Sequence, residues 1–325
     1  MSLTVMLQGS KSNTFLFLVD DKNDRSSDLS FFVINNNMEY NYVEVNKAFM
    51  PTQGIGYHPA AKIETRLLSI GDVKLLSMMT EDNMRGIYKE IIKRCCRFTN
   101  MTIDDLYLAD RDFLLFWIRS GSFVSNSGYS LKMDACPHCG KRSDVQVKLD
   151  DFELDFASAM TDSIVVNGEL VTFHHPKIND QRIALNDLEL SDVLTYTNLL
   201  EIFGDVRSCA QFLLSLDARS YLKLLHKTRK FRCGIRDELN LTCPICRNVF
   251  TTRMRLAEHD LMAQIPIDHI LKLILGICKY SNFQITDDML YAEVELMRNI
   301  VEEMSREEQK ELDKANGIET LSNFR

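Results

Sequence analysis

Two Cys-Pro-x-Cys motifs, "CPHC" at residues 136–139 and "CPIC" at residues 243–246, constrain the fold of this chain more than any other feature. Each motif offers two thiols at the spacing of a metal-binding turn, and each lies beside a strand-like segment. Structural zinc takes four ligands in a tetrahedron, so the two motifs together complete one site. We therefore predict about one structural Zn²⁺ per chain in a zinc-ribbon-like site, held by Cys136, Cys139, Cys243 and Cys246.

The distance between the motifs is long for a compact ribbon, because 103 residues separate Cys139 from Cys243. A shared site then makes the intervening chain an insertion, which is tolerable since each doubling of a loop's length costs only about 0.6 kcal/mol. Two alternatives stay open: separate or partial sites, and a site that holds no metal. Cys233, ten residues before Cys243, is a candidate substitute ligand.

Other uses of these cysteines fit the sequence less well. A Cys₂His₂ finger needs two histidines three to five residues apart, whereas His259 and His269 are separated by nine residues. A thioredoxin-like motif opens a helix, whereas turn residues and a strand follow Cys139. The remaining thiols are predicted to be buried small apolar side chains, namely Cys95, Cys96, Cys209 and Cys278.

No standard catalytic or nucleotide-binding motif is present in the sequence. The chain lacks G-x-x-x-x-G-K-[ST], G-x-S-x-G, H-E-x-x-H and G-x-G-x-x-G, so we expect no enzyme and no small-molecule substrate. The adjacent His174 and His175 face opposite sides of a predicted strand, which disfavours a shared metal. A group of acidic residues is assigned to helix capping and a solvated face, namely Asp104, Asp105, Asp110 and Asp112.

Charge and hydropathy limit the partners. The formal net charge of −8 opposes binding to phosphates by the protein as a whole. One basic stretch, "KLLHKTRKFRCGIR", keeps a zinc-ribbon nucleic-acid-binding factor open as an alternative, through Lys223, Lys227, Arg229, Lys230, Arg232 and Arg236. No secretory leader begins the chain, and no apolar run approaches the roughly 20 residues of a membrane span, so we expect a cytoplasmic origin and no membrane partner.

Periodicity predicts an α+β fold of mixed helices with small antiparallel β-hairpins. Strand-like pieces are expected within residues 13–45, at 62–67 and at 181–185, and Asn167-Gly168 predicts a hairpin turn. Helices are expected from Ser69 to about 79, over 81–97, from Thr102 to about 121, over 191–228 with a break at Gly204, and after Pro266. Trp117, within the third of these segments, is predicted to be buried beneath the zinc-bearing layer.

Taken in order, three segments resemble the baseplate hub subunit family of T4-like contractile-tailed bacteriophages: "GIGYHPAAKIETRLLSIGDVKLLSMMTEDN", "TIDDLYLADRDFLLFWIRSGSFVSNSGYS" and "CPHCGKRSDVQVKLDDFEL". The resemblance covers roughly residues 50 to 260, with His58 standing between the tyrosine and the proline of the family pattern. It implies a structural subunit of the tail baseplate, assembled in the infected bacterium's cytoplasm and carried in the virion. The implied partners are other baseplate and tail proteins, and an assembly chaperone absent from the virion is the alternative in the same setting.

The resemblance also suggests a division of the chain. We expect an N-terminal extension at 1–48, a baseplate-hub-like core with the zinc knuckles at 49–265, and a C-terminal helical extension at 266–325. The last of these is acidic, since residues 286–325 hold eleven acidic and five basic side chains.

Overall fold

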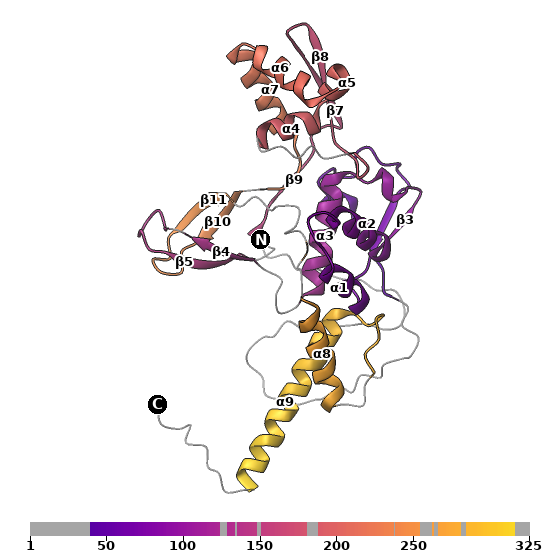
Figure 1. Ribbon diagram of the computed structural model, residues 1–325, viewed down its shortest axis with the longest axis vertical. Helices are drawn as coiled ribbons and strands as arrows, with labels where there is room; N and C mark the ends of the chain where they lie inside the picture. The colour runs from indigo at the N-terminus through magenta and orange to yellow at the C-terminus, as the bar shows by residue number, and fades with distance from the viewer. Residues whose placement is uncertain are drawn as a thin grey trace. The chain divides into compact units, whose positions relative to one another are not determined.

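The computed structural model describes residues 40–123, 129–133, 135–147, 151–180, 188–236, 238–253, 262, 266–280 and 284–315. The strands predicted before residue 40 and at 181–185 lie outside these ranges. Within them, helices alternate with one three-stranded sheet and several two-stranded ladders, all antiparallel. The α+β class predicted from periodicity is confirmed (Figure 1).

The first region combines a sheet with three helices. The sheet has the order β1-β2-β3. The elements are β1 (Val43–Glu44), β2 (Lys62–Thr65), α1 (Ile70–Ser77), α2 (Met84–Cys95), β3 (Cys96–Thr99) and α3 (Leu108–Ser122), with 3₁₀ turns at Lys47–Phe49 and Ile103–Asp105. Helix α2 shows why the segment folds, because its i, i+4 and i+5 positions Ile87, Ile91 and Ile92 are all buried.

Helix α1 begins where the sequence predicts. The Ser69 hydroxyl accepts from the Asp72 amide, and the Asp72 carboxylate accepts from the Ser69 amide, which forms a capping box. Asp72 also receives Arg66 at 2.7 Å in a buried ion pair. The cap therefore ties the start of α1 to the end of β2.

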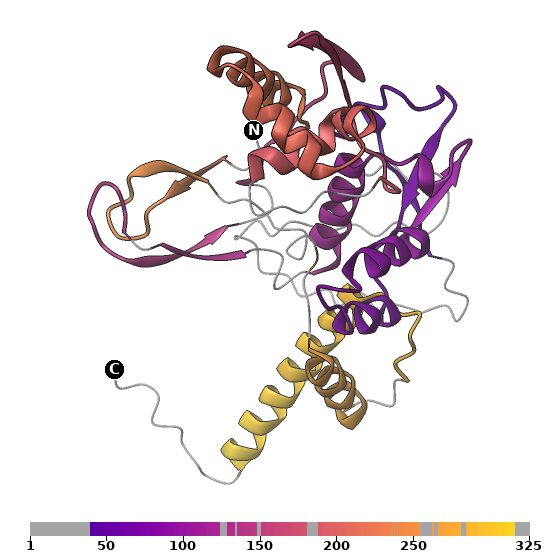
Figure 2. The same ribbon diagram turned by 45° about the horizontal axis from the view of Figure 1, so that its top comes forward.

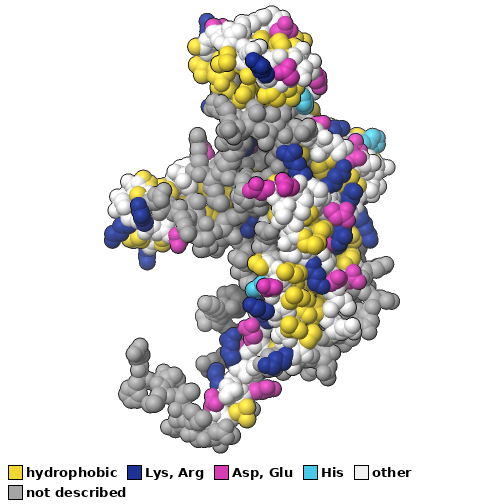
Figure 3. Space-filling view, viewed as in Figure 1, with side chains coloured by type: hydrophobic (Ala, Val, Ile, Leu, Met, Phe, Trp, Pro, Cys, Tyr) yellow, Lys and Arg dark blue, Asp and Glu magenta, His cyan; other side chains and the backbone are white. Residues whose placement is uncertain are grey.

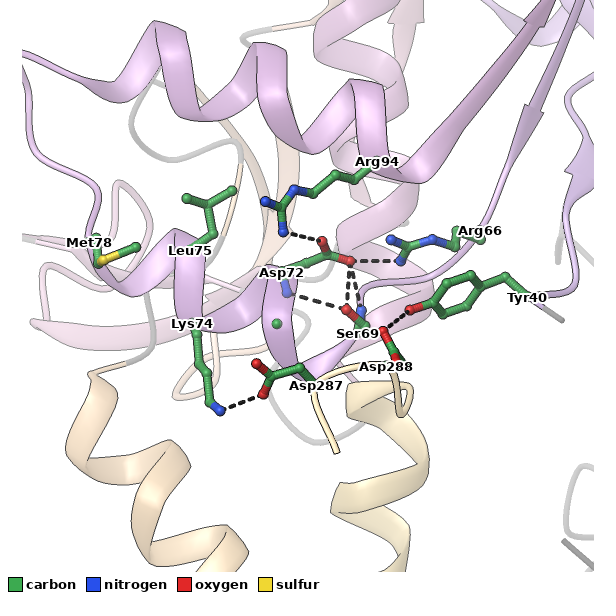
Figure 4. A pocket seen from close by; sticks show the side chains of 11 residues that line it. Tyr40, Arg66, Ser69, Asp72, Lys74, Leu75, Met78, Arg94, Asp287 and Asp288 are labelled. Carbon is green, nitrogen blue, oxygen red and sulfur yellow. Dashed lines mark hydrogen bonds and ion pairs between the residues drawn. The ribbon is translucent and has the colours of Figure 1, made fainter. Parts of the chain in front are cut away.

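The C-terminal helices α8 (Ile267–Tyr280) and α9 (Tyr291–Ala315) complete this core. The chain just before α9 caps α1, since the amides of Ile70 and Gly71 donate to the carbonyls of Met289 and Asp287 at 2.8 and 2.9 Å. Lys74 and Asp287 add a salt bridge of 2.5 Å, which Figure 4 shows. One apolar cluster joins these helices to α1–α3 through Ile270, Leu273, Ile277, Met289, Tyr291 and Val294.

A second group of elements has its own core. It contains β7 (Thr161–Val166), β8 (Glu169–His174), α4 (Leu188–Tyr196), α5 (Leu199–Phe203), α6 (Val206–Ser215) and α7 (Ala218–Phe231). The predicted hairpin is confirmed, with Asn167 and Gly168 both at positive φ (50° and 87°). The predicted break is confirmed as well, because Gly204 ends α5 at φ 82°.

A short ladder closes the base of this second group. Strand β6 (Leu154–Asp155) pairs with β9 (Gly234–Ile235), so the chain leaves and returns at one point. Beside the ladder, the Arg236 side chain reaches Asp155 at 2.7 Å and also pairs with Glu153. Residues 156–233 are thus an insertion between the two Cys motifs, as a shared site requires.

Two sequence predictions are wrong in detail. The Thr102–Asp105 capping box forms, but it caps a 3₁₀ turn, and α3 begins only at Leu108. Trp117 is 36% exposed, and its neighbour Phe116 packs on Phe152 beneath the Cys-bearing hairpins instead. The reason is the helical period, which turns adjacent aromatic residues on α3 to different faces.

Candidate metal centre

Each Cys-Pro-x-Cys motif lies in the turn of a two-stranded hairpin. Figures 1 and 2 show the two hairpins side by side. The first pairs β4 (Tyr129–Met133) with β5 (Ser143–Val147), and the second pairs β10 (Glu238–Thr242) with β11 (Val249–Arg253). Pairing of the flanking strands fixes where each turn begins and ends, so the two thiols of one motif point out of the same hairpin end.

The two turns have the same backbone hydrogen bonds. In each, the amide four residues after the first cysteine donates to that cysteine's carbonyl, at 2.8 Å for Cys136 and 2.9 Å for Cys243. The first cysteine's own amide donates to the carbonyl five residues on, at 3.0 Å in both turns. Gly140 and Arg247, at equivalent positions, both have positive φ (67° and 60°). The chain thus builds the same metal-binding turn twice.

The four thiols converge on one point. The Sγ atoms of Cys136 and Cys246 lie 3.8 Å apart, and those of Cys139 and Cys243 lie 4.0 Å apart. All four Sγ atoms lie within 4.8 Å of one another. A tetrahedral ion with bonds of about 2.3 Å to sulfur separates its ligands by about 3.8 Å. The four cysteines are therefore positioned to bind a metal ion.

The surroundings favour a closed structural site. Cys136 and Cys243 are buried, while Cys139 and Cys246 are half-buried. The backbone amide of Cys246 lowers the pKa of the Cys243 thiol, whereas the pKa of Cys246 itself is raised, so Cys243 loses its proton before Cys246. A small apolar core lies against the thiols, made of Val145, Val147, Phe152, Leu239, Leu241 and Phe250.

His138 adds a contact between the hairpins that sequence reasoning missed. Its Nε2 lies 3.1 Å from the carbonyl oxygen of Val249 in the other hairpin. Its own amide approaches Cys136 Sγ at 3.4 Å. The x position of "CPHC" therefore helps to hold the second hairpin in place, and no periodic signal marks that role.

Cys233 does not join the four thiols. Its Sγ lies 3.5 Å from Nδ1 of His175, which also contacts the Ala159 carbonyl at 2.9 Å and stacks on Phe231. Burial raises the pKa of Cys233 to about 12 and lowers the pKa of His175. Both groups are therefore neutral at pH 7, which suits a packed interior better than a reactive pair.

The remaining cysteine predictions are mostly confirmed. Cys95, Cys96 and Cys209 are buried. Cys278 is exposed, so that prediction is wrong, because the helical period places it beside the exposed Leu271 and away from the buried stripe of Ile270 and Ile277.

One of the acidic residues after Thr102, Asp110, departs from the prediction. Asp110 is fully buried, contrary to the prediction of a solvated face, and accepts hydrogen bonds from Thr52 (2.5 Å) and Tyr57 (2.7 Å). The Tyr57 hydroxyl also accepts from the Tyr107 amide at 3.1 Å. Gly56 admits this arrangement, since a Cβ there would lie 2.7 Å from the Tyr107 hydroxyl. The close approach to Tyr107 and the φ of 93° therefore account for the second glycine of "GIGY", and the hydrogen bond to Asp110 accounts for its tyrosine.

Three of the six cations of the basic stretch in α7 and beyond pair with acidic side chains of this protein. Lys227 pairs with Asp162 at 3.0 Å, Arg232 with Asp192 at 3.4 Å, and Arg236 with Asp155. These pairs partly neutralise the charge that phosphate binding would need.

A cavity of about 410 Å³ lies between α1 and the segment before α9. Figure 4 shows that its charged side chains pair with one another, as with Asp72 and Arg66 or Lys74 and Asp287. The cavity is therefore lined by ion pairs that connect neighbouring elements, and it does not present charge of a single sign. Its lining consists of Tyr40, Arg66, Ser69, Gly71, Asp72, Lys74, Leu75, Met78, Arg94, Asp287 and Asp288.

None of the described helices combines the length and apolarity needed to cross a bilayer.

Comparison with known proteins identifies the family. Searches of curated proteins and of solved structures gave no match. A family model described as "T4 bacteriophage base plate protein" matches residues 44–248. The matched stretch begins in β1, contains both Cys turns and ends beside the second one. Since it spans more than half of the 325 residues, the chain belongs to the T4 bacteriophage base plate protein family.

Proposed function

We propose that this protein is a structural, non-catalytic component of a contractile-tail baseplate, located at or near the hub. Membership of the base plate family is the observation that carries the proposal. In this role the protein binds other baseplate and tail proteins, is assembled in the cytoplasm of the host bacterium and remains in the virion.

Purified virions test this role. Quantitative mass spectrometry of intact particles should find the chain at a fixed small copy number relative to the other baseplate proteins. Its presence in assembly intermediates but not in finished particles would instead identify an assembly chaperone.

We further propose that Cys136, Cys139, Cys243 and Cys246 hold one structural Zn²⁺. Support comes from the thiol spacing, which suits a tetrahedral ion with sulfur ligands. Four thiolates close the coordination shell, so the ion would tie the two hairpins together without an open position for chemistry. Metal analysis of protein prepared without chelator should find about one zinc per chain, and a result of none or two would contradict the site.

A nucleic-acid-binding role is the weaker candidate, since Lys227, Arg232 and Arg236 are engaged in ion pairs. A salt-dependent gel shift of DNA or RNA, lost on neutralising all six cations of the basic stretch, would restore it; these are Lys223, Lys227, Arg229, Lys230, Arg232 and Arg236.

We keep the division into 1–48, 49–265 and 266–325 as a proposal about folding units. The boundary at residue 265 is the stricter test of this division, because α8 and α9 share one apolar core with α1–α3. Limited proteolysis followed by mass spectrometry tests both boundaries.

A further inference from the structure

Helix α8 is apolar on two sides. One side enters the core through Ile270, Leu273 and Ile277, which are almost fully buried. The other side carries Ile267, Leu271 and Leu275 at i, i+4 and i+8, with exposures of 43%, 46% and 67%. An apolar stripe that stays exposed beside the buried face of a helix marks a surface that a partner normally covers.

Helix α9 carries a matching stripe. Val294 faces the core, while Leu296 and Ile300, one turn apart, are 56% and 51% exposed. Figures 1 and 2 show α8 and α9 lying alongside each other, and the two helices are in contact. In Figure 3 hydrophobic side chains gather on the visible surface over this part of the chain. The hairpin thus exposes apolar residues on both of its helices.

The charges of the two helices differ in sign. Helix α8 contains one acidic and two basic side chains, Asp268, Lys272 and Lys279. Helix α9 contains eight acidic and four basic side chains. A copy of α8 laid against α9 of another molecule would therefore be attracted to it, whereas two α9 helices would repel each other.

We infer that the α8–α9 hairpin is a self-association surface, whose occupant is the same hairpin of a second copy. Two such hairpins form a four-helix bundle in which α8 of each copy lies on α9 of the other. This pairing buries the stripes of Leu271 and Leu275 together with those of Leu296 and Ile300. A two-fold axis makes both halves of the interface equivalent, and such dimers are the commonest protein oligomers.

Sedimentation of the full chain over a wide concentration range tests the inference. We expect a monomer–dimer equilibrium. Leu275→Glu should raise the dimer's dissociation constant by about tenfold to a hundredfold, because it places an uncompensated charge where a leucine would be buried. A wild-type protein that stays monomeric overturns the inference and leaves the surface to another tail protein.

Two matched variants guard the result. Leu214→Glu alters the most exposed large hydrophobic residue, at 86% and in the insertion, and should leave the dimer unchanged. Lys272→Glu does not alter the apolar stripes, so the fold should persist, and it should weaken the dimer by making α8 acidic. A dimer insensitive to both Leu275→Glu and Lys272→Glu would place the interface elsewhere, and equal loss in Leu214→Glu would remove the specificity of this surface.

Discussion

The hydroxyl of Tyr57 lies 2.7 Å from the carboxylate of Asp110, a side chain with no solvent exposure. This bond connects the irregular segment before β2 to the first turn of α3, across 53 residues. Removing one partner of a buried, charge-assisted bond leaves the other partner unsatisfied.

Tyr57→Phe should therefore lower the free energy of unfolding by about 1–3 kcal/mol, since it removes one of the hydrogen bonds to the Asp110 carboxylate and leaves the Tyr107 amide without its acceptor. Urea denaturation measures the change. Tyr40→Phe is the control, because its hydroxyl donates an exposed bond of 3.3 Å to Asp288. Equal effects from the two variants would contradict the role of the buried network.

The same carboxylate predicts a pH dependence. Burial raises the pKa of Asp110 above its usual value, so the folded state holds its proton more tightly than the unfolded state does. The stability contributed by this group is present below the unfolded pKa of about 3.9 and is lost as pH rises through the folded pKa. Unfolding measured against pH should show wild type losing stability relative to Asp110→Asn as pH rises.

Asp104 is the control, because its contribution to stability should change with pH in the opposite direction. A hydrogen bond from Lys89 lowers the pKa of Asp104, so its contribution is lost as pH falls through that lowered pKa. A profile of Asp110→Asn parallel to wild type would show that Asp110 titrates normally.

Replacing Cys139 and Cys246 with serine should lower the melting temperature, the zinc content and the yield of baseplates together. Each hairpin then keeps a single thiol, which cannot close a tetrahedral site. Particles that still assemble should inject normally, because a closed site holds structure only. Cys278→Ser, on an exposed thiol outside the cluster, is the control and should match wild type. Normal melting and assembly combined with lost infectivity would instead indicate an active role for the metal.

The paired turns predict a contrast between glycine positions. Gly140→Ala should destabilise the protein by about 1–2 kcal/mol, because the turn needs φ of +67° there. No neighbouring atom lies close to the added methyl group, so the loss would come from the backbone conformation alone. Arg247→Gly should be stabilising, since arginine holds the same left-handed conformation in the second turn.

Gly86→Ala provides the control for these glycine variants. Gly86 lies inside α2 with open space around it, so alanine should stabilise the helix by up to about 1 kcal/mol. Thermal melts should therefore show a lower melting temperature for Gly140→Ala and a higher one for Arg247→Gly and Gly86→Ala, and a neutral Gly140→Ala would refute the backbone explanation.

Trp117, the single tryptophan, should report its partial exposure. We expect a red-shifted emission maximum and quenching by iodide in the native protein. Blue-shifted emission without quenching by iodide would show instead that Trp117 is buried.

Local signals in the sequence were enough to predict much of this fold. Ser69 with Asp72, Asn167 with Gly168, and Gly204 each specify a backbone conformation through their own chemistry, and each forms as expected. The Cys motifs behave likewise, because their turn is encoded within six residues.

Features that depend on distant partners were missed. Asp110 resembles a solvated helix residue until Thr52 and Tyr57 are placed beside it. Trp117 and Phe116 are both apolar, and only the position of Phe152 decides which one is covered. The β6–β9 ladder is two residues long in each strand, too short for any periodic signal.

That ladder also fixes where the insertion begins and ends. Asp155 and Gly234 are register partners, so a two-residue turn joining the strands would replace 156–233 and restore an ordinary hairpin. The segment has its own apolar core, but it also contacts the first region outside the ladder, since the amides of Leu108, Ile178 and Ala157 donate to the carbonyls of Pro176, Leu106 and Pro51. Deleting 156–233 would therefore restore the hairpin and leave the thiol cluster its strands, but it would also remove these three hydrogen bonds from the first region.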